Sequence, residues 1–138
     1  QEPGLLHQPR TTSQLLHCNG TRLHLSVVKH VLFTLNGCPY ELLDDELHIK
    51  AVLITAAEIA KSELLNIASA KFDPQGVTAV ALLAESHISI HTWPELGQAI
   101  CDVFTCGDHT EPELAAEYMR ATMNAEDMIS NTFLRPLQ

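Results

Sequence analysis

The stretch VTAVALLAESHISIHTWPELGQAICDVFTC, residues 77–106, carries most of the information about the fold. It holds two apolar stretches of β-like composition, residues 77–90 with an interruption near Glu85 and residues 98–106. Between them, Pro94-Glu95-Leu96-Gly97 is a turn signal. Because consecutive strands joined by tight turns run antiparallel, this stretch predicts strands of an antiparallel sheet.

Further elements are predicted on the N-terminal side of this stretch. Residues 64–72 form another β-like stretch, which the turn sequence Asp73-Pro74-Gln75-Gly76 separates from the first. The segment from His24 to Leu35 alternates like a half-buried strand and ends at the turn signal Asn36-Gly37. Between these strands, the segment from Glu41 to Ala60 has near-helical apolar spacing and an acidic start, which predicts one helix.

A last helix is predicted near the C-terminus. Thr110, Pro112 and Glu113 form a capping-box start with proline in the first turn. Its apolar side is expected to consist of Leu114, Tyr118, Ala121 and Met128. This order of elements predicts an α+β fold, a two-layer sandwich with an antiparallel sheet and helices on one face. Apolar residues on both sides of the strand 77–83 predict that the other face packs on a second sheet from an identical chain.

Composition and charge narrow the class of protein. The chain has 138 residues, of which 46% are apolar, and it is expected to form one domain, residues 24–138, behind a mobile arm of residues 1–23. The formal charge of −9 argues against a nucleic-acid partner. The longest apolar run, residues 79–84, is far shorter than the roughly 20 residues of a membrane span, so we expect no membrane association. We interpret Cys18, Cys38, Cys101 and Cys106 as free thiols of a cytoplasmic protein.

The densest group of reactive side chains begins at Glu85. It comprises Glu85-Ser86-His87-Ile88-Ser89-Ile90-His91-Thr92-Trp93-Pro94-Glu95 and Asp102-Val103-Phe104-Thr105-Cys106-Gly107. Zinc would have to use His87, His91, Cys101 and Cys106, but a Cys-x-x-Cys pair is missing and the histidine spacing needs a helix, so no metal is expected. A serine hydrolase would need a Gly-x-Ser-x-Gly elbow, which is absent. Taken singly, each of these residues is better explained as a polar residue on a sheet surface, and Cys106 as a small core residue.

Together with Phe72-Asp73-Pro74-Gln75-Gly76-Val77, these segments resemble the small prokaryotic S-adenosylmethionine decarboxylases, from about His30 to Arg120. The resemblance implies a proenzyme that cleaves itself between Glu85 and Ser86 and converts Ser86 into a covalent pyruvoyl group. It further implies that this group forms a Schiff base with S-adenosylmethionine and accepts electrons as CO₂ leaves. The product would be the aminopropyl donor for spermidine synthesis.

The resemblance also assigns the catalytic roles. Ser86 would be the pyruvoyl precursor, and His91 would remove the Cα proton during processing. Cys106 would return a proton to the substrate carbon, whereas Cys101 is interpreted as a packing residue. A non-catalytic regulatory paralogue is the alternative from another class, although such a protein could lose these catalytic residues freely and this chain keeps them all.

Three other positions match the family, and two of them, Phe72 and Glu95, favour S-adenosylmethionine as the substrate. By resemblance, Phe72 stacks on adenine, Glu95 binds the ribose hydroxyls, and Thr78 stands where the family usually has a serine that assists processing. Two positions depart from the family pattern, with Ala70 in place of a common histidine and Thr34 in place of a common acidic residue. Pyruvoyl-dependent decarboxylation of arginine or ornithine is therefore the close alternative.

Spacing adds a constraint that is independent of any family. On one extended strand, Ser86 and His91 would lie about 16 Å apart at roughly 3.3 Å per residue, with side chains on opposite faces. One copy cannot then bring His91 to its own Ser86 unless the chain turns sharply near Glu85. We therefore expect a homodimer with sites at the interface. The resemblance implies that Ser86 and Cys106 of one chain meet His91, Glu95, Phe72 and Thr78 of the other.

Overall fold

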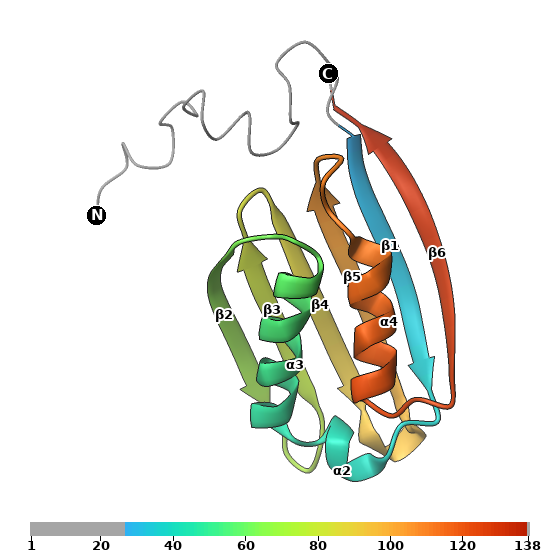
Figure 1. The fold of residues 1–138 in the computed structure, drawn as a ribbon. Coiled ribbons are helices and arrows are strands. Elements are labelled where there is room, and N and C mark those ends of the chain that lie inside the picture. Colours follow the sequence, from blue (N-terminus) through green and yellow to red (C-terminus); the bar gives the residue numbers. More distant parts are fainter. Residues whose placement is uncertain (1–26, 138) are drawn as a thin grey trace, which may run out of the picture.

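The computed structural model describes residues 27–137 and shows a six-stranded antiparallel sheet with helices on one face (Figure 1). Its strands are β1 (Val27–Asn36), β2 (Leu64–Lys71), β3 (Val77–Leu83), β4 (Ser86–Trp93), β5 (Gln98–Cys106) and β6 (Asp127–Pro136), in the spatial order β2-β3-β4-β5-β1-β6. The helices are α2 (Tyr40–Leu43), α3 (Glu46–Ile59) and α4 (Pro112–Thr122), with a 3-10 turn η2 (Pro94–Leu96). The α+β two-layer architecture is thus confirmed, while the expected arm of residues 1–23 lies outside the described residues.

The centre of the sheet follows the prediction closely. The interruption near Glu85 is a two-residue turn, because Leu83 of β3 pairs with Ser86 of β4. Strand β5 has the predicted bounds, and β4 extends beyond the predicted end at Ile90 to Trp93. The alternation of strand side chains therefore sends one set of residues from this region toward the helices and the other set to the open face.

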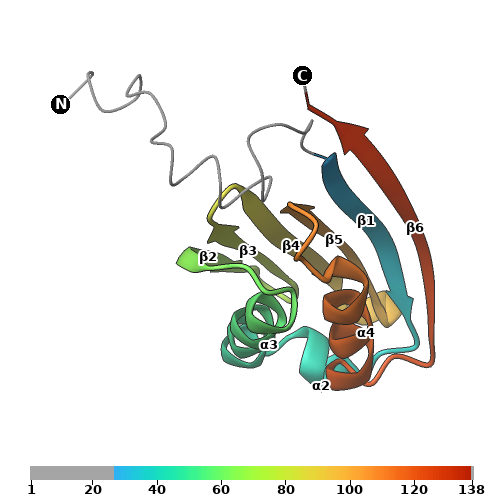
Figure 2. The same ribbon diagram turned by 45° about the horizontal axis from the view of Figure 1, so that its top comes forward.

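Helices α3 and α4 cover one face of the sheet (Figure 2). Helix α3 buries Ile49, Val52, Leu53, Ala56 and Ala57, and helix α4 buries Pro112, Ala115, Ala116 and Met119. Small alanine side chains let each helix approach the sheet closely, and larger residues fill the space between them. Within the described residues, none of the helices has the length and apolar character required to cross a membrane.

The prediction of a single helix from Glu41 to Ala60 is wrong, because the structure has two helices there. The helical conformation is interrupted at Asp44 and Asp45, and two separate helices, α2 and α3, lie on either side of this interruption. Asp45 caps α3, since its side chain accepts a hydrogen bond from the His48 backbone N–H at 3.0 Å. Short acidic side chains bind nearby backbone groups in this way, so they start or end helices more readily than they continue them.

The predicted capping box at the last helix is also wrong. The Thr110 hydroxyl donates to the Gly107 carbonyl at 2.8 Å, while Glu111 takes the N-cap position without a side-chain cap. Leu114 and Ala121 of the expected apolar side are exposed. Thr110 is buried beside Thr105, with 3.0 Å between the two hydroxyl oxygens. The Thr110 hydroxyl therefore bonds within the loop before α4 and does not cap the helix.

Strand β6 was not predicted. Met128, expected on the last helix, belongs to this strand, which pairs with β1 at the edge of the sheet (Figure 1). Almost every residue of β6 is exposed, including Phe133 and Leu134. Because neither face of the strand is buried, its sequence carries no alternation of apolar and polar residues.

The face of the sheet opposite the helices is open. Large apolar side chains remain exposed on it, namely Leu32, Leu82, Ile100, Ile129 and Phe133. Exposed apolar surface of this kind marks a site of interaction with another molecule. We call this surface the open face.

Candidate active site

Ser86 and Cys106 lie at one end of two neighbouring strands. Ser86 is the first residue of β4 and Cys106 is the last residue of β5, and the last pair of the β4–β5 ladder at this end joins His87 to Phe104. Glu85, which precedes Ser86, has φ of 66°, a left-handed conformation that is costly for residues with a Cβ atom. We call Ser86 and Cys106 the turn-end group.

Four other predicted site residues lie at the opposite end of β4. Thr78 pairs with His91 across β3 and β4, with 3.1 Å between Thr78 Oγ1 and His91 Nδ1. Glu95 lies in η2 directly after β4, and Phe72 directly follows β2. We call these four residues the far-end group.

The loop that carries Phe72 is fixed by Asp44. The Phe72 backbone N–H donates to the Gly76 carbonyl at 2.8 Å, and Gly76 has φ of 111°, which glycine adopts without strain. The Asp44 carboxylate accepts from the Gly76 N–H at 2.8 Å and pairs with Lys71 Nζ at 3.0 Å. Hydrogen bonds from Gly76 and Lys71 hold the pKa of Asp44 below its ordinary value. The break between α2 and α3 therefore positions Phe72 in a defined loop.

The structure separates the two groups within one chain. Residues 86–93 form a single strand, so five residues of extended chain separate Ser86 from His91, or about 16 Å. The sharp turn at Glu85 lies before Ser86 and does not fold Ser86 back toward His91. One chain therefore holds the predicted site residues in two separate sets at opposite ends of β4.

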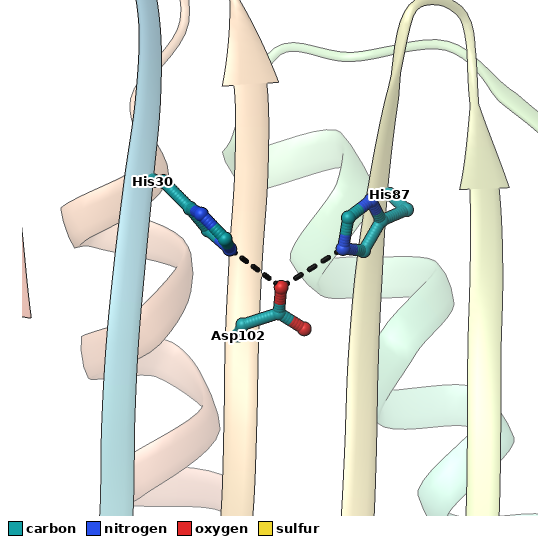
Figure 3. A group of neighbouring side chains, drawn as sticks. All are labelled: His30, His87 and Asp102. Atoms are coloured by element: carbon teal, nitrogen blue, oxygen red, sulfur yellow. Dashed lines mark hydrogen bonds and ion pairs between the residues drawn. The ribbon is translucent and has the colours of Figure 1, made fainter. Parts of the chain in front are cut away.

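Sequence reasoning missed a cluster of polar side chains in the middle of the open face. The Asp102 Oδ2 atom lies 2.7 Å from His30 Nε2 and 2.8 Å from His87 Nε2 (Figure 3). The Ser89 hydroxyl donates to the other oxygen, Oδ1. We call these four residues, which come from β1, β4 and β5, the Asp102 cluster. No spacing rule finds it, because its members meet only through the strand order β4-β5-β1.

The charge of Asp102 is stabilised by its neighbours. Burial opposes ionisation, but hydrogen bonds from His87, Ser89 and His30 outweigh it and hold the pKa of Asp102 well below its ordinary value. His30, His87 and Asp102 offer a set of possible metal ligands with atoms within 4.8 Å of one another. Both imidazole Nε2 atoms, however, already bond to one carboxylate oxygen, an arrangement that satisfies the side chains through hydrogen bonds.

An Asp102→Asn variant is expected to lose part of the dependence of stability on acid. The depressed native pKa means that unfolding takes up a proton at low pH, so the contribution of the carboxylate is present above its unfolded pKa of about 3.9 and lost below it. The stability advantage of wild type over the variant should shrink by up to about 1.4 kcal/mol per pH unit in that window. Urea unfolding of both proteins at about pH 3, 4 and 7 measures this difference. Parallel pH profiles would contradict the assigned charge.

The three described cysteines are all buried but differ in their covalent state. Cys38 and Cys101 are free, as expected, and Cys101 is buried as the packing interpretation requires. Cys38 is buried as well, and burial raises the pKa of both thiols, that of Cys38 to about 11. Cys101 faces the helices while His87 and His91 lie on the open face, so the four ligands considered for zinc do not converge. Cys106 is disulfide-bonded, and the expectation of a free thiol is wrong there. Cysteine spacing does not reveal which thiol a fold places at the end of a strand.

Comparisons with known proteins identify the family of this chain. The sequence profile of the family described as S-adenosylmethionine decarboxylase matches residues 29–136. The S-adenosylmethionine decarboxylase proenzyme of Synechococcus sp. (strain WH7803) is 51% identical over 109 residues, which cover 79% of this chain and 85% of that protein. The proenzyme of the same name from Methanococcus maripaludis is 53% identical over 85 residues, covering 62% of this chain and 70% of that protein.

A solved structure supports the same relationship. The crystal structure of the adenosylmethionine decarboxylase from Aquifex aeolicus superposes with a TM-score of 0.74 and 33% sequence identity, covering 83% of this chain and 95% of that chain. The matched sequence includes the turn at Glu85, both groups of predicted site residues and the Asp102 cluster. The chain therefore belongs to the S-adenosylmethionine decarboxylase family.

Proposed function

We propose that this chain is a self-processing proenzyme that cleaves itself between Glu85 and Ser86 and then decarboxylates S-adenosylmethionine. The observation that carries the proposal is the left-handed Glu85, with φ of 66°, directly before Ser86 in a two-residue turn. This conformation costs about 1–2 kcal/mol for a residue with a Cβ atom. Breaking the Glu85–Ser86 bond removes the closed turn that imposes it.

Processing uses the side chain of Ser86 and a base. Ser86 Oγ attacks the carbonyl carbon of Glu85, so that the peptide C–N bond breaks and an ester C–O bond forms. His91 then removes the Cα proton of residue 86, and the Cβ–O bond breaks, which releases Glu85 as a carboxylate. Addition of water and loss of ammonia leave a pyruvoyl carbonyl at the new terminus. For His91 to accept the proton at Nε2, its Nδ1 must carry a hydrogen, which it donates to Thr78 Oγ1 at 3.1 Å.

The residues around the new terminus fit the reaction of the mature enzyme. The pyruvoyl group supplies an electrophilic carbonyl that captures the substrate amine and accepts electrons as CO₂ leaves. Cys106 ends β5 at the same end of the sheet as Ser86, where its thiol can return a proton to the substrate carbon. This role needs the reduced thiol, so activity is measured in the presence of a thiol reductant.

We propose further that the complete site contains two chains. The turn-end group and the far-end group lie at opposite ends of β4, which prevents one chain from assembling them. A symmetric dimer with the two open faces in contact would bring the turn-end group of each chain to the far-end group of its partner. It would also cover the exposed Leu32, Leu82 and Ile100.

The proposed substrate is supported by the chemistry of the far-end group. Phe72 is half-exposed beside the open face, where its ring is available to stack on a purine. The exposed Glu95 carboxylate can accept hydrogen bonds from ribose hydroxyls. Ala70 pairs with Thr78 next to these residues, so the departure from the family pattern at Ala70 lies where the substrate would bind.

The release of CO₂ from carboxyl-labelled substrates tests the proposed reaction. S-adenosylmethionine, arginine and ornithine are compared at equal concentrations with enzyme that mass spectrometry has shown to be cleaved. Preference for S-adenosylmethionine supports the proposal, while turnover of only arginine or ornithine would assign the close alternative. Intact mass alone identifies a non-catalytic paralogue, since such a protein would remain one uncleaved chain.

Replacing Phe72 by alanine is expected to raise KM for S-adenosylmethionine more than it lowers kcat. Loss of one ring stacked on a base costs about 1–3 kcal/mol, or roughly 5- to 150-fold in KM. Steady-state kinetics of the processed variant measure the effect, and Phe72→Trp, which keeps an aromatic face, serves as the matched control. An unchanged KM in Phe72→Ala would remove this residue from the substrate site.

A further inference from the structure

The Asp102 cluster ties three strands together through side chains. On β4, the ring of His87 bonds to Asp102 Oδ2 at 2.8 Å and stacks on Phe104, with 5.1 Å between ring centroids and 12° between planes. Ser89, on the same strand, donates to Oδ1 of the same carboxylate. His30 holds the carboxylate from the side of β1 at 2.7 Å. The roles proposed for processing and decarboxylation use none of these contacts.

Self-cleavage would remove the covalent connection between β3 and the first residue of β4. In the uncut chain, the turn Ala84-Glu85 connects β4 to β3. Cutting the bond between Glu85 and Ser86 turns the first residue of β4 into a chain terminus, and chain termini fray unless other contacts hold them. Fraying here would displace the reactive group itself, because that group would sit on residue 86.

We infer that the Asp102 cluster anchors the cut end of β4 and thereby holds residue 86 beside Cys106, a positioning role that rests on the proposed self-processing. His87 directly follows the new terminus, and its ring is fixed by a charged hydrogen bond and by stacking. Asp102, Phe104 and Cys106 are successive open-face residues of β5. A tie between His87 and Asp102 therefore aligns the start of β4 with the strand that carries Cys106.

The geometry predicts that the hydrogen bonds to Asp102 from β4 matter more for holding the cut end of β4 than the hydrogen bond from His30 on β1 does. His87 and Ser89 belong to the strand that is cut, whereas His30 belongs to β1, which stays continuous. The opposite end of β4 continues through η2 into β5 and needs no additional tie. A residue that merely stabilised the fold would act equally before and after cleavage, while an anchor acts mainly after it.

Hydrogen exchange at the amides of residues 87–89 tests the anchor. The mature wild-type protein is compared with the uncleavable Ser86→Ala precursor, and His87→Phe, which keeps an aromatic ring, is compared in both forms. We expect wild-type protection to survive cleavage, and protection in mature His87→Phe to fall about tenfold or more, with a fall of similar size in kcat. The same change in the precursor should alter exchange by less than about threefold.

Two further variants control for a general loss of stability. His30→Phe removes the tie from β1 and should reduce protection of residues 87–89 less than His87→Phe does. Ser69→Ala removes the hydrogen bond of 2.6 Å to Glu46, far from the cut, and should leave exchange at β4 and kcat unchanged. If His87→Phe is not cleaved, Ser89→Ala and Asp102→Asn take its place.

The outcomes separate this inference from the proposed function. A wild-type chain that is not cleaved would overturn the proposed function. A cleaved wild type whose residues 87–89 lose their protection would overturn the anchor alone. Mature His87→Phe with wild-type exchange and wild-type kcat would do the same.

Discussion

The Ser86→Ala variant is expected to remain a single chain and to release no measurable CO₂ from S-adenosylmethionine. Without Oγ, residue 86 can neither attack the Glu85 carbonyl nor become a pyruvoyl group, so processing and catalysis fail together. Intact mass spectrometry under native expression conditions measures the first effect, and labelled CO₂ release measures the second. Wild type should yield two polypeptides, residues 1–85 and 86–138, and the second should have a blocked terminus.

Two comparisons make the result of Ser86→Ala interpretable. Ser89→Ala removes another β4 hydroxyl, which donates to Asp102 rather than facing the scissile bond, and should still be cleaved. Ser86→Cys keeps a nucleophile at the same place and should be cleaved slowly. Complete cleavage of Ser86→Ala between residues 85 and 86 would remove Ser86 from the mechanism.

Heterodimers of Ser86→Ala with His91→Ala are expected to regain activity that neither homodimer has. If each site takes Ser86 from one chain and His91 from the other, one of the two sites in this heterodimer is intact, and activity should reach about half of the wild-type value. The distance of about 16 Å between the two residues along β4 is the physical reason. The chains are co-expressed with different affinity tags, and the heterodimers are purified on both.

The matched control reverses the distribution of the same substitutions. A heterodimer of wild type with the double variant Ser86→Ala/His91→Ala would have no intact site if sites are shared between chains, and one intact site if each site lies within one chain. Activity in this control, combined with none in the first heterodimer, would refute the two-chain site. Both heterodimers carry the same substitutions, so a difference in stability cannot produce the contrast.

The central strands and the interruption near Glu85 were predictable from the sequence, whereas a sharp turn at Glu85 was only one of two open possibilities. Alternation over residues 77–106 reflects burial of every second side chain under the helices, and the turn residues 94–97 interrupt it where the chain reverses between β4 and β5. Sequence patterns do not predict the structure where strand residues stay exposed or where a contact joins distant parts of the chain. Strand β6 is exposed along nearly its whole length and shows no alternation, and the break at Asp44 depends in part on Gly76, 32 residues further along the chain.

The reactive side chains were identifiable from the sequence alone, and strand geometry gave the separation of Ser86 and His91 on the condition that both residues lie on one extended strand. The structure meets this condition, because β4 runs from Ser86 to Trp93. Which distant residues meet depends on the folded sheet. His30, His87 and Asp102 come together because β5 lies between β4 and β1 in a particular register. Strand order and register arise from packing of the whole sheet against α3 and α4, which no local pattern encodes. For the same reason, the left-handed backbone of Glu85 became visible only in the folded turn.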